Sequence, residues 1–487
     1  MSSFKNNFLK KYLDLFILIP ILIGLILPFS FVEYGFITAF IIIEVIILLI
    51  IGYIILKYKH YVLYILAFLI PLSVQTTIIG SSKINFPSEA ICIMLSCYVF
   101  IKSLFNIKIT KAFFYHPITI LLTIDILWLL LTSSLCELKD VAFKRTLIRI
   151  MYIVVYYYLF NELFKINIKN IYTVFLLHAV GMVYPIINTT VFHAQFNFSS
   201  QGSVMASFPF YNDHTIYGAA LAIFVPFAIF QVIKSIKEKS NLRIWLSCLL
   251  LLLLIVGVFS SYSRAAWLSL ILAFGLFILL KIKISAKYFV SASAMALIVT
   301  LLSWGSISEY LQKSKEISHK NDIGTHFKSV TNVKTDASNT ERLNRWKCAW
   351  RMFLDKPVFG FGPGSYQFFY GAYQQRKDMT AISTFKGNKG HAHSEYLNYL
   401  SETGLIGALN FLALVIITCY FGIKIIYKTN DELIKNTTMF VLLGFFTYII
   451  HAFFNGFIET DKIAMPFFVC ISAIVALYTK NKSLQSL

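Results

Sequence analysis

Long apolar runs recur along the whole chain and are separated by short polar, mostly basic segments. Each run is about 20 residues long, the length that an α-helix needs to cross a bilayer. The alternation of apolar and polar residues typical of barrel strands is absent, so the pattern favours helical spans. We place them at residues 12–32, 34–56, 61–79, 86–101, 117–133, 147–162, 171–192, 215–233, 244–260, 265–281, 287–304, 403–424, 438–456 and 463–479. The division of 12–56 is ambiguous and 86–101 is short, so we predict an all-α polytopic membrane protein with about 12–14 transmembrane helices.

The composition supports this class of protein. Of the 487 residues, 58% are hydrophobic and 14% are charged, whereas soluble domains carry about 25% charged residues. This composition excludes an ordinary soluble enzyme, a disordered chain and a disulfide scaffold. The 7 cysteines do not pair by spacing, and we do not expect a bond between Cys136 and Cys348, which lie outside the apolar runs.

The charge balance is strongly basic, with 43 Lys and Arg against 23 Asp and Glu and a net charge of +20. In a soluble chain this excess would suggest nucleic acid. In a membrane chain, the positive-inside bias and an anionic lipid or pyrophosphate ligand explain it first. We therefore expect membrane lipids as partners and no nucleic acid.

The distribution of basic residues predicts the orientation of the chain. The basic start, MSSFKNNFLKKY, precedes an apolar run without a small-residue cleavage site, which predicts an uncleaved first span. With this terminus in the cytoplasm, 22 Lys and Arg lie in inside segments and 7 in short outside ones, as the positive-inside rule requires. The chain then divides into transmembrane helices at 1–304, a large outward loop at 305–394 and C-terminal transmembrane helices at 395–487.

The large outward loop contains a predicted helix and turn, NTERLNRWKCAWRMFLDKPVFGFGPGSY, at residues 339–366. Asn339 or Thr340 can cap this helix, and Arg342 and Arg345 flank its apolar face. Helical spacing predicts that face from Leu343, Trp346, Trp350 and Phe353.

Three glycines, Gly360, Gly362 and Gly364, follow Pro357 and end the helix. They could cradle a phosphate, but they fit no nucleotide fingerprint, so a tight turn is the favoured interpretation.

The stretch HAHSEYLNYLSETGLIGALNFL, residues 391–412, begins a helix that continues as the next span. His393 is thus predicted at the outer membrane boundary, where an imidazole can move a proton. The alternative is an ordinary surface histidine. His391 and His393 could suggest a metal, but no carboxylate or cysteine set completes a site, so none is expected.

Several outward polar residues lie at the mouths of spans. Arg264 follows FSSYS and precedes an apolar run, where it could bind phosphate oxygens or serve as a snorkelling anchor. Arg145 and Arg149 are four residues apart and share a helix face, with lipid headgroup contact as the alternative. Asp213, next to His214, could orient a base, but capping of the following helix is favoured.

Ionisable residues inside the apolar runs suggest a different class of function. Glu44, Asp125 and His178 lie within predicted spans, and intramembrane ionisable groups are a functional hypothesis by default. They would suit a proton-coupled transporter, although they show no internal repeat.

Four stretches together resemble the bacterial O-antigen ligase family, whose fold is shared by the O-antigen polymerases and the protein O-oligosaccharyltransferases. They are FYNDHTIYGAAL, SYSRAAWLSL, NTERLNRWKCAWRMFLDKPVFGFGPGSY and HAHSEYLNYLSETGLIG, in the order and topology of the family, between residues 207 and 412. The last two are the more specific. Residues 1–200 match only as apolar spans.

The resemblance implies a metal-independent, inverting glycosyltransferase of the bacterial inner membrane, with no cofactor. It would transfer a glycan from a polyisoprenyl (undecaprenyl) pyrophosphate donor to an acceptor at the periplasmic face. By resemblance, His393 is the base and Arg264 the main pyrophosphate ligand, and the periplasmic loop 305–394 carries part of the active site. The secondary substrate-binding candidates are Arg342, Arg345, Arg145, Arg149, Asp213, His214 and Glu402, the last of which could instead only orient its helix.

Lipid A–core is the expected acceptor, which would make the protein an O-antigen ligase of lipopolysaccharide synthesis. Two alternatives share the fold: a polymerase that uses a second lipid-linked repeat, and an enzyme that modifies Ser or Thr of proteins. A transporter of lipid-linked sugar is the alternative from a different class.

Overall fold

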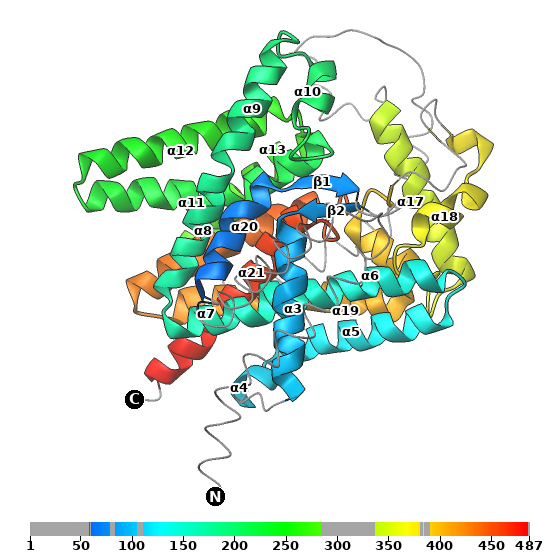
Figure 1. Ribbon diagram of the computed structural model, residues 1–487, viewed down its shortest axis with the longest axis horizontal. Coiled ribbons are helices and arrows are strands. Elements are labelled where there is room, and N and C mark those ends of the chain that lie inside the picture. The colour runs from blue at the N-terminus through cyan, green and yellow to red at the C-terminus, as the bar shows by residue number, and fades with distance from the viewer. Residues whose placement is uncertain are drawn as a thin grey trace, which may run out of the picture.

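The computed structural model describes residues 58, 60–77, 83–104, 111–283, 337–379, 383 and 390–485 (Figure 1). Within these residues, nine helices are long and apolar enough to cross a membrane. They are Pro117–Leu135, Lys139–Ile166, Lys169–Ala194, His214–Lys237, Asn241–Ser260, Arg264–Lys281, Glu395–Lys428, Glu432–His451 and Asp461–Asn481. The predicted all-α polytopic class is therefore confirmed.

The elements follow one another along the chain as helices, with one strand pair near the start of the described region. They are β1 (Val74–Thr77), β2 (Lys83–Phe86), α3 (Ser88–Leu104), α4 (Lys111–Phe114), α5 (Pro117–Leu135), α6 (Lys139–Tyr152), α7 (Phe160–Ile166), α8 (Lys169–Gly181), α9 (Val183–Ala194), α10 (Ser200–Ala206), α11 (His214–Lys237), α12 (Asn241–Ser260), α13 (Arg264–Lys281), α17 (Ala337–Asp355), α18 (Tyr366–Phe369), α19 (Glu395–Lys428), α20 (Glu432–His451) and α21 (Asp461–Gln485). A π-helical stretch, Ile153–Leu159, joins α6 to α7.

Nine of the predicted spans overlap the nine helices, and 86–101 forms α3, which has 17 residues. The other four differ or lie outside the described residues. The predicted spans 12–32, 34–56 and 287–304 lie outside the described residues. The predicted span 61–79 is wrong in its second half, because the helix ends at Leu72 and β1 pairs antiparallel with β2. Pro71 lies in the last helical turn, and the β-branched residues that follow favour a strand.

The helix α21 forms the centre of the bundle. It is the most deeply buried of the nine candidate spans, and it packs against α7, α19 and α20. The helices α11 and α12 pack side by side and extend away from α17 and α18, as Figure 1 shows. On α12, Leu246, Leu249 and Leu252 are exposed, as expected for a lipid-facing surface.

The helix α17 differs from its prediction at its start and in its buried face. It begins at Ala337, so Asn339 and Thr340 lie inside its first turn rather than capping it. The side chains of Cys348, Ala349 and Met352 are buried under the turn that follows, whereas Trp350 is 38% exposed. The segment that follows α17 folds back and covers the face that carries small and sulfur-containing side chains. The helical spacing of the large apolar residues does not predict this choice of face.

The long helix α19 is broken at Gly404, where φ is 68° and ψ is −169°. The break exposes backbone groups to the turn that follows α17: Leu405 N donates to Pro357 O at 2.8 Å, and Gly362 N donates to Glu402 O at 2.8 Å. A side chain at Gly404 would come within 2.1 Å of Val358 O. The outer part of α19 and the glycine turn are therefore one packed unit.

Candidate functional site

The site lies at one end of the bundle. The helices α11, α13, α19 and α21 begin at this end and α12 and α20 finish there, because connected neighbours run antiparallel. Ser394 caps α19 by accepting a hydrogen bond from Leu397 N, and Glu395 N donates to Ala452 O at 2.8 Å. These bonds hold the segment before α19 against the loop between α20 and α21.

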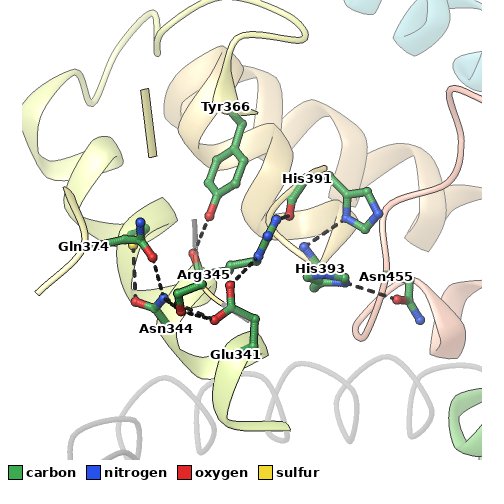
Figure 2. Close-up of polar contacts among 10 residues, drawn as sticks. Glu341, Asn344, Arg345, Tyr366, Gln374, His391, His393 and Asn455 are labelled. Carbon is green, nitrogen blue, oxygen red and sulfur yellow. Dashed lines mark hydrogen bonds and ion pairs between the residues drawn. The ribbon is translucent and has the colours of Figure 1, made fainter. Parts of the chain in front are cut away.

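The backbone of His393 is held in a left-handed conformation, with φ at 50°. A non-glycine residue in this region is uncommon and usually reflects constraint by its surroundings. His393 N donates to His391 Nδ1 at 3.0 Å, and Trp346 Nε1 donates to His393 O at 3.0 Å. Figure 2 shows that His393 lies between His391 and Asn455.

The ring of His393 is half-buried and faces a polar group on the next loop. Its Nδ1 lies 3.5 Å from Asn455 Oδ1. Burial, followed by the electrostatic interactions with His391, Arg345 and Arg342, holds the pKa of His393 well below its ordinary value. Its imidazole is therefore neutral at neutral pH and can accept a proton.

His391 has a similar electrostatic environment. Burial, followed by the charge of Arg345, lowers the pKa of His391 to about 4, while Asp213 and Glu459 oppose this shift. Its ring contacts the ring of His393 edge-on at 4.7 Å between centroids. The histidine pair is therefore neutral as a unit.

Arg345 acts as a clamp between α17 and the histidine segment. Its Nε lies 2.9 Å from Glu341 Oε1 in a buried ion pair, and its Nη1 donates to His391 O at 3.2 Å. Tyr366 Oη donates to Arg345 O at 2.9 Å, and the guanidinium lies over the Tyr370 ring. Figure 2 shows the contacts of Arg345 with Glu341, Tyr366 and the His391 segment. The predicted ligand Arg345 is thus already neutralised by Glu341.

Arg145 and Arg149 both lie on α6, and their surroundings differ. Arg145 Nη1 forms an ion pair with Glu459 Oε2 at 2.6 Å. Arg149 is 8% exposed, and its guanidinium lies near the rings of Tyr399 and Phe468, at 5.6 and 5.8 Å. Among the described residues, no carboxylate lies within 4.0 Å of it. Asp125, Glu395 and Glu459 act on its charge from beyond this distance. An arginine that no carboxylate contacts directly still has its donor groups open to an incoming anion.

Glu402 holds the glycine turn on α19. Its carboxylate accepts hydrogen bonds from Gly364 N at 2.9 Å and from Tyr366 N at 3.0 Å. Asn398 Nδ2 also donates to it, at 3.1 Å. Glu402 therefore ties the glycine turn to α19. These bonds favour the orienting role over direct substrate binding, the two alternatives that the sequence left open for Glu402.

The three glycines form the tight turn that the sequence favoured. All have positive φ, and the amides of Gly362 and Gly364 are bonded to Glu402. A side chain at Gly364 would come within 2.5 Å of Arg145 Cγ. The turn therefore packs directly against Arg145. The amides of Gly362 and Gly364 already donate hydrogen bonds to Glu402, so they are not available to a phosphate.

Asp213, His214 and Arg264 come from neighbouring helix starts. Asp213 caps α11 through Thr215 N at 2.6 Å, as the sequence favoured. His214 Nδ1 lies 2.7 Å from Ser261 O, which ties α11 to the turn before Arg264. Arg264 is half-buried at the first residue of α13, which packs along α20 towards the end that carries the site.

Residues of the loop between α20 and α21 escaped the sequence analysis. His451, Asn455 and Glu459 lie on or next to this loop and face the predicted site residues. Glu395 was also missed; its carboxylate accepts from Tyr448 Oη at 3.2 Å. The available signal was the set of polar residues His451, Asn455 and Glu459 in the stretch HAFFNGFIET, which alone does not show what they contact.

Of the predicted intramembrane groups, Asp125 and His178 lie on different helices of the described part of the chain, α5 and α8. Asp125 is buried within α5, while His178 stacks on Phe224 at 4.5 Å between ring centroids. Glu44 lies outside the described residues. Cys136 and Cys348 are both free thiols.

The fold and site define a polytopic membrane protein with a histidine- and arginine-rich site at one end of its helix bundle. Residues 249–412 match the family model described as O-antigen ligase. The match covers Arg264, α17, the glycine turn, His393 and Glu402, and it confirms the resemblance to the O-antigen ligase family, whose members transfer glycans.

A relative of this chain is an uncharacterized protein of Haemophilus influenzae. The two are 21% identical over 197 residues, which are 40% of this chain and 46% of the relative. The chain therefore matches less than half the length of that relative.

Proposed function

We propose that this protein transfers a glycan from a polyisoprenyl pyrophosphate donor to an acceptor hydroxyl at the periplasmic face of the bacterial inner membrane. Lipid A–core is the proposed acceptor, which makes the reaction O-antigen ligation. The observation that carries the proposal is a neutral, constrained His393 beside a set of arginines, within the segment that matches the family. A base and an anion site are the two parts that this reaction requires.

In the proposed reaction, His393 Nε2 takes the proton of the acceptor hydroxyl as its oxygen attacks the anomeric carbon of the donor glycan. The bond between that carbon and the pyrophosphate oxygen breaks, and the lipid pyrophosphate leaves with the electron pair. Attack opposite the leaving group inverts the anomeric configuration. Because protonated His393 cannot act as a base, the rate should fall as the pH drops through the pKa of His393.

The arginines stabilise the charge that develops on the leaving pyrophosphate. Arg264 and Arg149 are the proposed ligands, with Arg145, Arg342, Asp213 and His214 lining the approach. The contacts of Arg149 support this role, since no acidic side chain among the described residues pairs closely with it. Arg345 and Glu402 contribute by holding the loop that presents His393.

A reconstituted transfer assay tests the function. Purified protein in liposomes receives a polyisoprenyl-pyrophosphate-linked glycan and, separately, lipid A–core, a second lipid-linked repeat or a Ser/Thr peptide. We expect glycan on lipid A–core, reduced about 10²- to 10⁴-fold in His393→Ala and about 10²- to 10³-fold in Arg264→Ala. Arg243→Ala is the matched control, because Arg243 pairs with Glu238 between α11 and α12 at the opposite end.

Each other outcome has a defined meaning. A ladder of lengthened lipid-linked glycan identifies a polymerase, and a glycosylated peptide identifies a protein O-oligosaccharyltransferase. A transporter is supported, and the proposal contradicted, by a combined result. No acceptor receives glycan, cells with His393→Ala make surface glycan like wild type, and cells with Asp125→Asn do not.

A further inference from the structure

We propose that Asn455 and His451 form a positioning relay that holds His393 in the tautomer with its proton on Nδ1. Nε2 is then left as the nitrogen that accepts a proton. The inference deepens the proposed function, because it names the residues that prepare the base. Neither relay residue lies within the segment that matches the family.

The contacts form a chain of three side chains. Asn455 Nδ2 lies 3.0 Å from His451 Nε2, and Asn455 Oδ1 lies 3.5 Å from His393 Nδ1. An amide has a donor end and an acceptor end. With its donor end directed at His451, it presents an acceptor to His393, which must therefore carry the proton on Nδ1.

The Asn455 amide lies in a buried setting beside the last turn of α20. Asn455 and His451 are each 1% exposed, and Asn455 N donates to His451 O at 3.2 Å. His451 is the last residue of α20, so the relay connects the membrane helix to the site. A reversed amide would direct its NH₂ group at His393 Nδ1 and place the proton on Nε2, which would prevent base catalysis.

The backbone contacts of His393 fix its main chain but not the protonation of its ring, which depends on the relay. Trp346 and His391 fix the main chain, but they do not bond either ring nitrogen of His393. The charged and titratable groups that act on the ring are His391 on its own segment and Arg342 and Arg345 on α17. Asp213 and Glu459 act on the neighbouring His391. Among the described residues, the ring of His393 accepts or donates no hydrogen bond to a carboxylate, so a carboxylate introduced at position 455 would be a new influence.

The test compares Asn455→Ala with Asn455→Asp in the reconstituted transfer assay. Asn455→Ala removes the acceptor for Nδ1, so kcat should fall about 10- to 100-fold with little change in the KM for the donor, less than the loss of the base itself. Asn455→Asp keeps an acceptor and adds a negative charge, which favours the imidazolium and raises the pKa of His393. Its activity should recover at high pH, with the acid limb of the profile displaced to higher pH.

A matched control is Asn161→Ala, which removes another buried asparagine whose Nδ2 donates to Ser472 O, far from His393 in sequence and on α7. It should leave the pH profile unchanged. If Asn455→Asp loses as much activity as Asn455→Ala and its acid limb stays in place, Asn455 has only a structural role and the relay is wrong.

A second readout does not depend on catalysis. Diethylpyrocarbonate modifies unprotonated imidazole nitrogens, and mass spectrometry measures the modification of His393 as a function of pH. The relay predicts that Asn455→Asp displaces this profile to higher pH while the profile of His214 stays constant. An unchanged His393 profile contradicts the relay, whether or not transfer is observed; absence of transfer with a displaced profile contradicts only the proposed function.

Discussion

Two buried arginines of the site differ in what neutralises them. Arg345 pairs with Glu341, and both side chains are almost fully buried. Arg149 is equally buried, but among the described residues its near neighbours are aromatic rings rather than a carboxylate within ion-pair distance. At the scale of the residue, burial alone therefore does not distinguish a structural arginine from one that can bind an anion.

Substitution by methionine should separate the two roles. Arg345→Met leaves Glu341 buried without its partner, which should destabilise the protein by about 3–5 kcal/mol. Arg149→Met removes a charge that no carboxylate contacts directly and that Asp125 and Glu395 feel only at longer range, so the melting temperature in detergent should fall less than for Arg345→Met, while transfer falls about 10²- to 10³-fold. Thermal unfolding and the transfer assay measure both effects. A large loss of stability in Arg149→Met would show that its charge is structural.

At the scale of the element, the broken helix α19 presents the site. Its outer part carries Glu395 and Glu402, and its break at Gly404 receives the turn that follows α17. Glu402 then bonds the amides of that turn. On α19, Gly404 permits this arrangement, because its backbone conformation is open essentially only to glycine.

Gly404→Ala should therefore lower stability by at least about 2 kcal/mol, from backbone strain and the clash with Val358 O. It should also reduce transfer, because the glycine turn would no longer pack against the break in α19. Gly275→Ala is the matched control: Gly275 lies inside α13, and an added Cβ meets nothing within 4 Å. Its stability should be unchanged or raised by up to about 1 kcal/mol. Equal melting temperatures for the two variants would disprove the role of the break.

At the scale of the whole molecule, alternating helix directions bring distant helix ends together. His214, Arg264, His393 and Asn455 come from segments far apart in sequence, yet all lie at or beside helix ends on the same side of the bundle. The turn between α11 and α12, which contains Lys239, lies at the opposite end. The proposed function requires the end with the site to face the periplasm.

Labelling in intact cells tests this orientation. On a background without native cysteines, Lys377→Cys in the loop after α18 should react with a membrane-impermeant maleimide added outside. Lys239→Cys should react only after the inner membrane is permeabilised. Both positions are exposed, so accessibility to the reagent depends on the side of the membrane. The reverse pattern would place the site in the cytoplasm and exclude a periplasmic acceptor.

The amino-acid sequence alone predicts the helical membrane class and nine of the spans, because hydropathy and helical spacing are local properties of the chain. It also located Asp213 as a cap, the glycine turn and the segment before α19, since these depend on near neighbours. The orientation and the roles of the site residues stay predictions.

Which polar groups meet depends on how the helices pack in three dimensions. This packing joined Arg145 to Glu459, Glu402 to the glycine turn and Asn455 to His393. It also replaced part of the predicted span 61–79 by a strand and selected an unexpected buried face on α17. These contacts depend on the packing of helices that are distant in sequence, and no local pattern of hydrophobic and polar residues records that packing.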